Sequence, residues 1–105
     1  MNLSFLEPAQ AEIEEAIDRY NEHRTGLGDE LSALVDEAIG RILRHPSIAP
    51  RLSANVRRLR VGRFPYGILY QVRSEEILIV AFMHLRRDPQ YWRSRIPGAG
   101  VPPAK

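Results

Sequence analysis

The stretch Ile77–Arg95, ILIVAFMHLRRDPQYWRSR, decides the fold. It begins with an uninterrupted apolar run, Ile77–Met83, which is rich in β-branched residues and too short for a typical helix. Such a run predicts a central β-strand that is covered on both faces. The residues that follow it form the most cationic and aromatic segment of the chain. They are His84, Arg86, Arg87, Tyr91, Trp92, Arg93 and Arg95.

This segment has two interpretations. Functional side chains are often found where a rigid element leads into a loop, because the element holds them still while the loop exposes them. Alternatively, Tyr91 and Trp92 fold back over the sheet as a lid, and the arginines only solvate it.

Two more strands precede the central one. In Val56–Val61 the residues alternate, which places Leu59 and Val61 on one face and the arginines at positions 58 and 60 on the other. A turn at Gly62–Pro65 leads into a second alternating stretch, residues 66–73, and Ser74–Glu76 forms a polar turn into the central strand. The pattern predicts a three-stranded β-meander.

Continuing the alternation predicts that His84 and Arg86 share a face with Arg58 and Arg60. We expect this face to point away from the helices and to form a groove. Its floor would consist of Gly67, Leu69 and Gln71, and arginines would surround it.

The N-terminal part predicts a short strand and two helices. Asn2–Leu6 is typical of a strand, and Pro8 suits the first turn of a helix whose apolar stripe is Ala9, Ile13, Ala16, Ile17 and Tyr20. After a turn at residues 25–28, a second stripe runs from Leu31 to Leu43 and stops before Pro46. The expected class is α+β in the order β-α-α-β-β-β. An antiparallel helical hairpin packs on one face of a small, mainly antiparallel, twisted sheet.

Length and composition limit the possible functions. The 105 residues suit one domain, which we place at residues 1–96, followed by a flexible tail at 97–105 that is rich in Pro, Gly and Ala. The absence of cysteine excludes disulfides and thiolate chemistry, and the three histidines have no ligand spacing, so we expect neither metal nor cofactor. No stretch resembles a membrane span or a secretion signal, which predicts a cytoplasmic protein.

Charge is distributed unevenly along the chain. Residues 1–37 hold ten acidic and two basic residues, a net charge of −8, whereas residues 38–105 hold three acidic and thirteen basic residues, a net charge of +10. Fourteen of the fifteen basic residues are arginine, whose planar fork suits carboxylate and phosphate groups. The basic part of the chain therefore predicts an anionic partner, which is either nucleic acid or an acidic protein segment. The alternative is that the acidic helices and the basic sheet simply attract each other.

Two motifs resemble a known family. Arg63–Tyr70 (RFPYGILY), followed by His84–Arg95 (HLRRDPQYWRSR), is similar to the RelE/ParE toxin superfamily, as is the predicted order of elements, from about Leu3 to Ile96. The resemblance implies a ParE-like plasmid stabilisation protein, the toxin of a bacterial type II toxin–antitoxin system. It also implies that a cognate antitoxin holds the toxin inactive in a hetero-oligomer.

Two activities occur on this fold, so the resemblance leaves the target open. RelE-like members cleave mRNA on the ribosome, and ParE-like members poison DNA gyrase. Compared with the RelE-like pattern, arginines replace lysines at positions 58 and 60, Gly67 replaces a strand arginine, Arg86 matches, and Tyr91 or Trp92 falls near the terminal tyrosine. A permanently charged arginine is a poor general base, so these departures favour gyrase inhibition without catalysis.

The expected binding residues for target or antitoxin are cationic or aromatic. They are Arg58, Arg60, Arg86, Arg87, Tyr91, Trp92 and Arg95. If the protein is instead a ribonuclease, the catalytic set would be Arg60, His84, Arg86 and Tyr91, with the imidazole as acid or base. For His84 the alternative is a structural bond to a neighbouring carbonyl. A third possibility is an inactive interaction module.

Overall fold

The computed structural model describes residues 1–88 and 90–95. Their elements follow the predicted order, so the α+β class is confirmed. They are β1 (Asn2–Phe5), α1 (Glu7–His23), α2 (Leu27–Arg44), β2 (Arg57–Arg60), β3 (Tyr66–Val72), β4 (Glu76–His84) and a 3₁₀ helix (Arg93–Arg95). The predicted tail, 97–105, lies outside the described residues.

The four strands form one sheet in the order β1-β4-β3-β2. β4 pairs in parallel with β1 and antiparallel with β3, and β3 pairs antiparallel with β2. Every residue of β4 from Ile77 to Met83 is buried. The prediction of a central strand covered on both faces is therefore correct.

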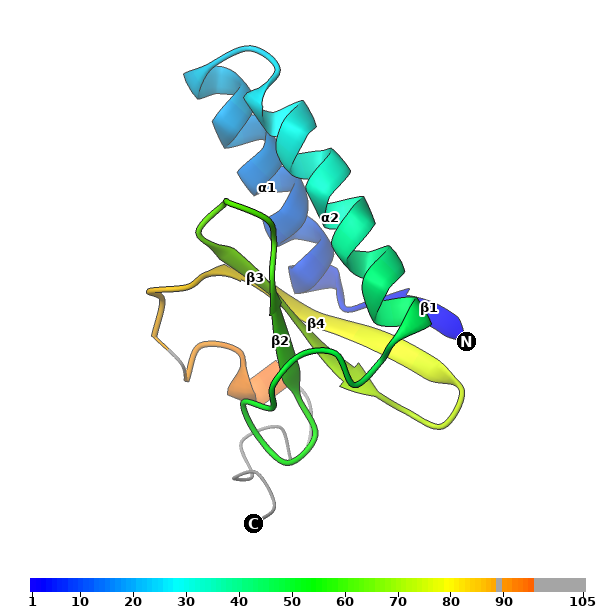
Figure 1. Ribbon diagram of the computed structural model, residues 1–105. Coiled ribbons are helices and arrows are strands. Elements are labelled where there is room, and N and C mark those ends of the chain that lie inside the picture. Colours follow the sequence, from blue (N-terminus) through cyan, green and yellow to red (C-terminus); the bar gives the residue numbers. More distant parts are fainter. Residues whose placement is uncertain (89, 96–105) are drawn as a thin grey trace.

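The helices cover one face of the sheet, and the hairpin extends beyond the sheet at its closed end (Figure 1). α1 buries Ala9, Ile13 and Ala16, and α2 buries a longer stripe that includes Leu31 and Val35. These side chains join those of β3 and β4 in one core that we call the helix-side core. Both amphipathic stripes predicted from the sequence face it.

α2 begins earlier than predicted, because Gly28 lies in its first turn instead of in the loop. The amide of Gly28 donates to the Asn21 side-chain oxygen at 2.8 Å. A Cβ on Gly28 would lie 2.1 Å from the carbonyl oxygen of Ile17. Glycine at this position lets α2 approach the backbone of α1 and so closes the hairpin.

An extra residue in β4 reverses the alternation of its side chains. Leu69 pairs with Ala81, but the next residue, Tyr70, pairs with Ile79, so Val80 is the additional residue of a β-bulge. Tyr66 consequently pairs with His84. The prediction that His84 shares a face with Arg58 and Arg60 is wrong, because the alternation was continued through the bulge.

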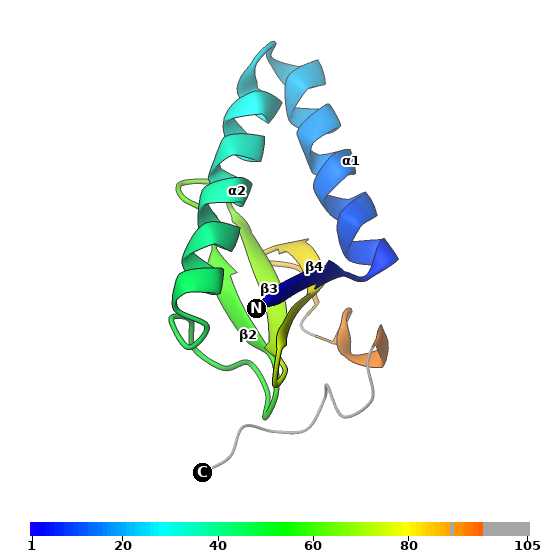
Figure 2. The same ribbon diagram turned by 90° about the vertical axis from the view of Figure 1, so that its right-hand side faces the viewer.

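The second face of the sheet, which we call the outer face, is covered by the segment after β4. Figure 2 shows this segment in orange, on the side of the sheet away from α2. Trp92 is only 1% exposed and belongs to a second apolar cluster. The other buried members are Val56, Leu69, Leu78, Val80, Ala81 and Met83. The groove expected over Gly67 and Leu69 is not open, because both residues are buried.

Candidate functional site

A recess on the outer face contains four arginines, which come from three segments of the chain. Arg58 lies on β2, Arg86 and Arg87 follow β4, and Arg93 begins the 3₁₀ helix. We call this site the arginine recess; its volume is about 380 Å³. Its remaining lining is apolar and consists of Leu52, Met83, Leu85 and Trp92.

Gly67 determines how Arg58 enters this recess. Arg58 pairs with Leu69 in the sheet, two residues along β2 from Arg60, which pairs with Gly67 on the same face. A Cβ on Gly67 would lie 2.8 Å from Cγ and 2.9 Å from Cδ of Arg58. The aliphatic part of the Arg58 side chain therefore lies across β3 where the glycine leaves space.

The charge of the recess is not balanced within the described part of the chain. The four salt bridges found there use Arg24, Arg63, Arg73 and Arg95. None of them includes an arginine of the recess, and none of the residues that line the recess is acidic. Guanidinium groups gathered without carboxylates repel each other and attract an anionic ligand.

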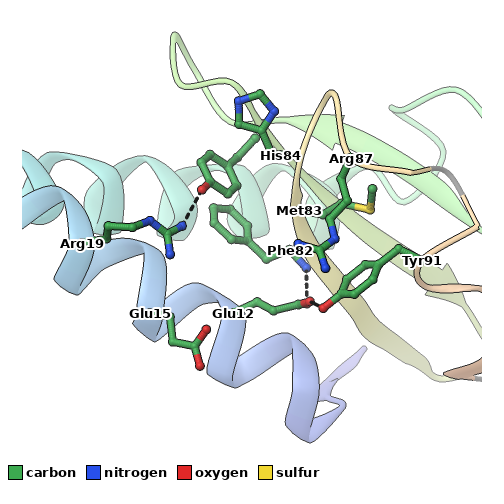
Figure 3. Close-up of a pocket in the computed structure, with 9 residues that line it drawn as sticks. Glu12, Glu15, Arg19, Phe82, Met83, His84, Arg87 and Tyr91 are labelled. Atoms are coloured by element: carbon green, nitrogen blue, oxygen red, sulfur yellow. Dashed lines mark hydrogen bonds between the residues drawn. The ribbon is translucent and has the colours of Figure 1, made fainter.

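A second, smaller recess of about 130 Å³ lies where α1 meets the end of β4 (Figure 3). We call it the histidine recess. The rings of His84 and Tyr66 form a T-shaped pair with 5.5 Å between their centroids, and Arg19 donates to the Tyr66 hydroxyl at 2.7 Å. The polar side chains that line it include those of Glu12, Glu15, Arg19, His84 and Arg87.

His84 is held by the turn that follows it. Its Nδ1 accepts a hydrogen bond from the backbone N–H of Arg86 at 3.0 Å. The bond is thus made to an amide and not to the carbonyl proposed above. Because Nδ1 accepts, the neutral ring carries its proton on Nε2.

Glu12 fastens the segment after β4 to α1. Its carboxylate accepts two hydrogen bonds from Arg95, at 2.7 and 2.8 Å, one from the Tyr91 hydroxyl, and one from the Phe82 amide at 3.1 Å. Arg95 also donates to the Val80 carbonyl at 3.0 Å, so these hydrogen bonds include the extra residue of the β-bulge. We call this arrangement the Glu12 clasp.

The clasp shifts the pKa of each of its side chains. Burial raises the pKa of Glu12, but the hydrogen bonds from Arg95, Tyr91 and Phe82 outweigh it and lower the pKa below the ordinary 4.5. The hydrogen bond to Glu12 raises the pKa of Tyr91, and burial adds to that shift. It also raises the pKa of Arg95. Glu12 therefore stays ionised and Arg95 stays protonated.

The structure brings together only part of the predicted binding set. Arg58, Arg86 and Arg87 share the arginine recess, whereas the exposed Arg60 lies outside it and donates to the Gly62 carbonyl at 3.2 Å. Tyr91 and Arg95 belong to the clasp, so neither is a free surface group. Trp92 is buried against the sheet, as the lid interpretation expected of this side chain, so it does not offer an aromatic anchor at the surface.

The predicted ribonuclease set does not converge either. His84 and Tyr91 line the histidine recess, Arg86 lines the arginine recess, and Arg60 lines neither. General acid–base cleavage of a phosphodiester requires its groups around one scissile bond.

Sequence reasoning missed two residues that shape the site, Glu12 and Arg19. Glu12 lies three residues after Ala9 and four before Ala16, at the border of the buried stripe of α1. That spacing was a signal that its carboxylate could reach the core margin. Arg19 lies three residues after Ala16 and seven after Glu12, on the same side of α1, so its spacing carried the same signal.

Within residues 1–88 and 90–95, no group of three or more His, Cys, Asp or Glu side chains could hold a metal ion. In the same part of the chain, neither helix combines the length and the apolar character that crossing a membrane requires.

Comparisons with known proteins identify relatives of this fold. Residues 3–89 match the family model described as "ParE toxin of type II toxin-antitoxin system, parDE". A solved structure, "Chromosomal ParDE TA system from P. aeruginosa", is similar with a TM-score of 0.60 and 19% identity, over 80% of this chain and 95% of that one. At that identity the similarity concerns the fold alone. No curated protein matches the chain.

Proposed function

Since the chain belongs to the ParE toxin family of type II toxin–antitoxin systems, we propose that a cognate antitoxin neutralises it and that the free toxin inhibits DNA gyrase. The toxin would act in the cytoplasm, where this target works. Inhibition of this kind requires a surface that binds gyrase and involves no chemical step.

One observation carries the choice of gyrase over mRNA cleavage. The bulge in β4 puts His84 beside Tyr66 on the helix side, while Arg58 lies on the outer face. An imidazole and the arginines that would stabilise the phosphate must surround the same bond in a ribonuclease. His84 and the two arginines of the predicted catalytic set, Arg60 and Arg86, do not line one common recess, which supports a protein that binds its target without cleaving RNA.

The target is tested with purified chain and purified gyrase. We expect loss of negative supercoiling and accumulation of cleaved DNA. Arg86→Gln should weaken the inhibition, because Arg86 is exposed at the arginine recess. Arg73→Gln, which removes the same charge beside Glu76, is the matched control and should inhibit normally. Unaffected gyrase, together with codon-positioned mRNA cuts on ribosomes, would replace this proposal with the RelE-like activity.

The antitoxin is tested by coexpression with the small reading frame next to the gene. We expect a stable complex that copurifies and restores growth. Harmless expression of this chain alone would contradict an active toxin and favour an inactive interaction module.

A further inference from the structure

We infer that the arginine recess is the docking site for an acidic, amphipathic peptide segment of the antitoxin, which places carboxylates on the arginines and an aliphatic side chain on the apolar floor. The inference deepens the proposed function and rests on it in naming the antitoxin as the partner. The recess and its chemistry are argued from this chain alone.

Charge is the first argument. Arg58, Arg86, Arg87 and Arg93 line one recess with no acidic residue, although the structure pairs Arg24, Arg63, Arg73 and Arg95 with carboxylates elsewhere. Within residues 1–88 and 90–95, carboxylates thus pair with other arginines, and none lines this recess. A ligand that brings carboxylates would form charge-assisted, bidentate bonds, which are the strongest that arginine makes.

The side chains on the floor of the recess favour a peptide ligand over a nucleic acid. Single-stranded nucleic acids bind on exposed aromatic rings that stack with their bases. Here Trp92 is 1% exposed, and the Tyr91 ring lies under Arg87, 3.8 Å from its guanidinium carbon, with its hydroxyl bound to Glu12. The half-buried side chains of Leu52 and Leu85 offer apolar contact instead of stacking. An aliphatic side chain of a peptide fits such a floor.

Size limits the occupant to a short segment. The volume of about 380 Å³ lies near the lower end of the range for ligand sites. It can take a few side chains of an extended or helical segment. The surrounding arginines would then contact the acidic residues that flank the aliphatic anchor.

The test measures binding of three labelled probes to the full chain by fluorescence anisotropy. The first is an amphipathic peptide of leucine and glutamate, the second has glutamine at every glutamate position, and the third is a thymidine oligonucleotide of equal net charge. We expect the glutamate peptide to bind tightest and to weaken with added salt. Arg86→Gln should weaken it about tenfold, the loss of one charge-assisted contact. Arg73→Gln should leave the affinity unchanged.

Several results would overturn the inference. They are no binding of the glutamate peptide, equal binding of the glutamine peptide, tighter binding of the oligonucleotide, or equal effects of Arg86→Gln and Arg73→Gln. Since Arg86 is exposed, its substitution should not unfold the chain, and thermal unfolding checks this point. No gyrase is present in the assay. Failure of supercoiling inhibition with intact peptide binding would therefore reassign the target and leave the docking site in place.

Discussion

The two faces of the sheet are closed by different means. On the helix-side face, two long amphipathic helices bury a large continuous core. On the outer face, a short segment after β4 covers a smaller cluster with one large side chain, Trp92, and is fastened by the Glu12 clasp. The arginine recess opens beside that segment.

The difference shows how one small sheet can provide both stability and binding. A face covered by whole helices has little room for a partner. A face covered by a few residues can have a buried, stable centre and still bind a partner at its edge. The charge of the recess is tolerated because the helix-side core supplies most of the apolar burial.

Of the substitutions considered, removal of the Trp92 side chain should destabilise the outer face most. Trp92→Ala should lower the free energy of unfolding by about 3 to 5 kcal/mol, because it leaves a large cavity under the segment after β4. Urea denaturation measures the loss, and Trp92→Phe should retain part of the stability. A loss below about 1 kcal/mol would mean that the segment does not form a core in solution.

Two adjacent residues of β3 compare the faces directly. Ile68 and Leu69 are both 0% exposed, but Ile68 belongs to the helix-side core and Leu69 to the outer cluster. Ile68→Ala should cost about 3 to 4 kcal/mol and Leu69→Ala about 2 to 3 kcal/mol, since a smaller cluster collapses more easily around the gap. Chemical denaturation of both variants gives the order. The reverse order would make the outer face the principal core.

Acid should weaken the outer face through the Glu12 clasp. Because the pKa of folded Glu12 lies below 4.5, its contribution is complete above pH 4.5 and is lost as the pH falls through the folded value. Glu12→Gln should cost about 1 to 3 kcal/mol at neutral pH, and this difference from the wild type should shrink in acid. Urea denaturation across the acid range measures it. Glu15→Gln, an exposed neighbour, should behave like the wild type, and an equal loss there would contradict the clasp.

The smallest effect is expected at Gly67. Gly67→Ala should cost about 1 kcal/mol, because the new methyl group meets the movable side chain of Arg58 and not the backbone. The displaced guanidinium should nevertheless reduce binding of the glutamate peptide. Unchanged binding would remove Arg58 from the docking site.

Patterns of local sequence predicted most of the architecture. The stripes of α1 and α2 follow from spacings of three and four, and the apolar run of β4 indicated burial on both sides. Both signals depend on residues close together in the chain. They were therefore visible without knowledge of the tertiary structure.

The site was predictable only in part, for two physical reasons. Nothing in the run Ile77–Met83 distinguishes a regular strand from one with an extra residue at Val80, so the side taken by His84 could not be derived. The partners of Tyr91 and Arg95 depend on Glu12, some eighty residues earlier in the chain. Such contacts arise from tertiary packing and leave no periodic signal.

The extra residue of β4 also affects how roles should be transferred between relatives. Positions before Val80 can be matched to a relative by simple alignment and will keep their orientation. In a relative whose strand is regular, positions after it lie on the opposite face of the sheet. An identical residue at the aligned position would then contact different side chains. Functional comparison within the family should therefore start from the cross-strand partner, as Tyr66 is for His84, and only then consider residue identity.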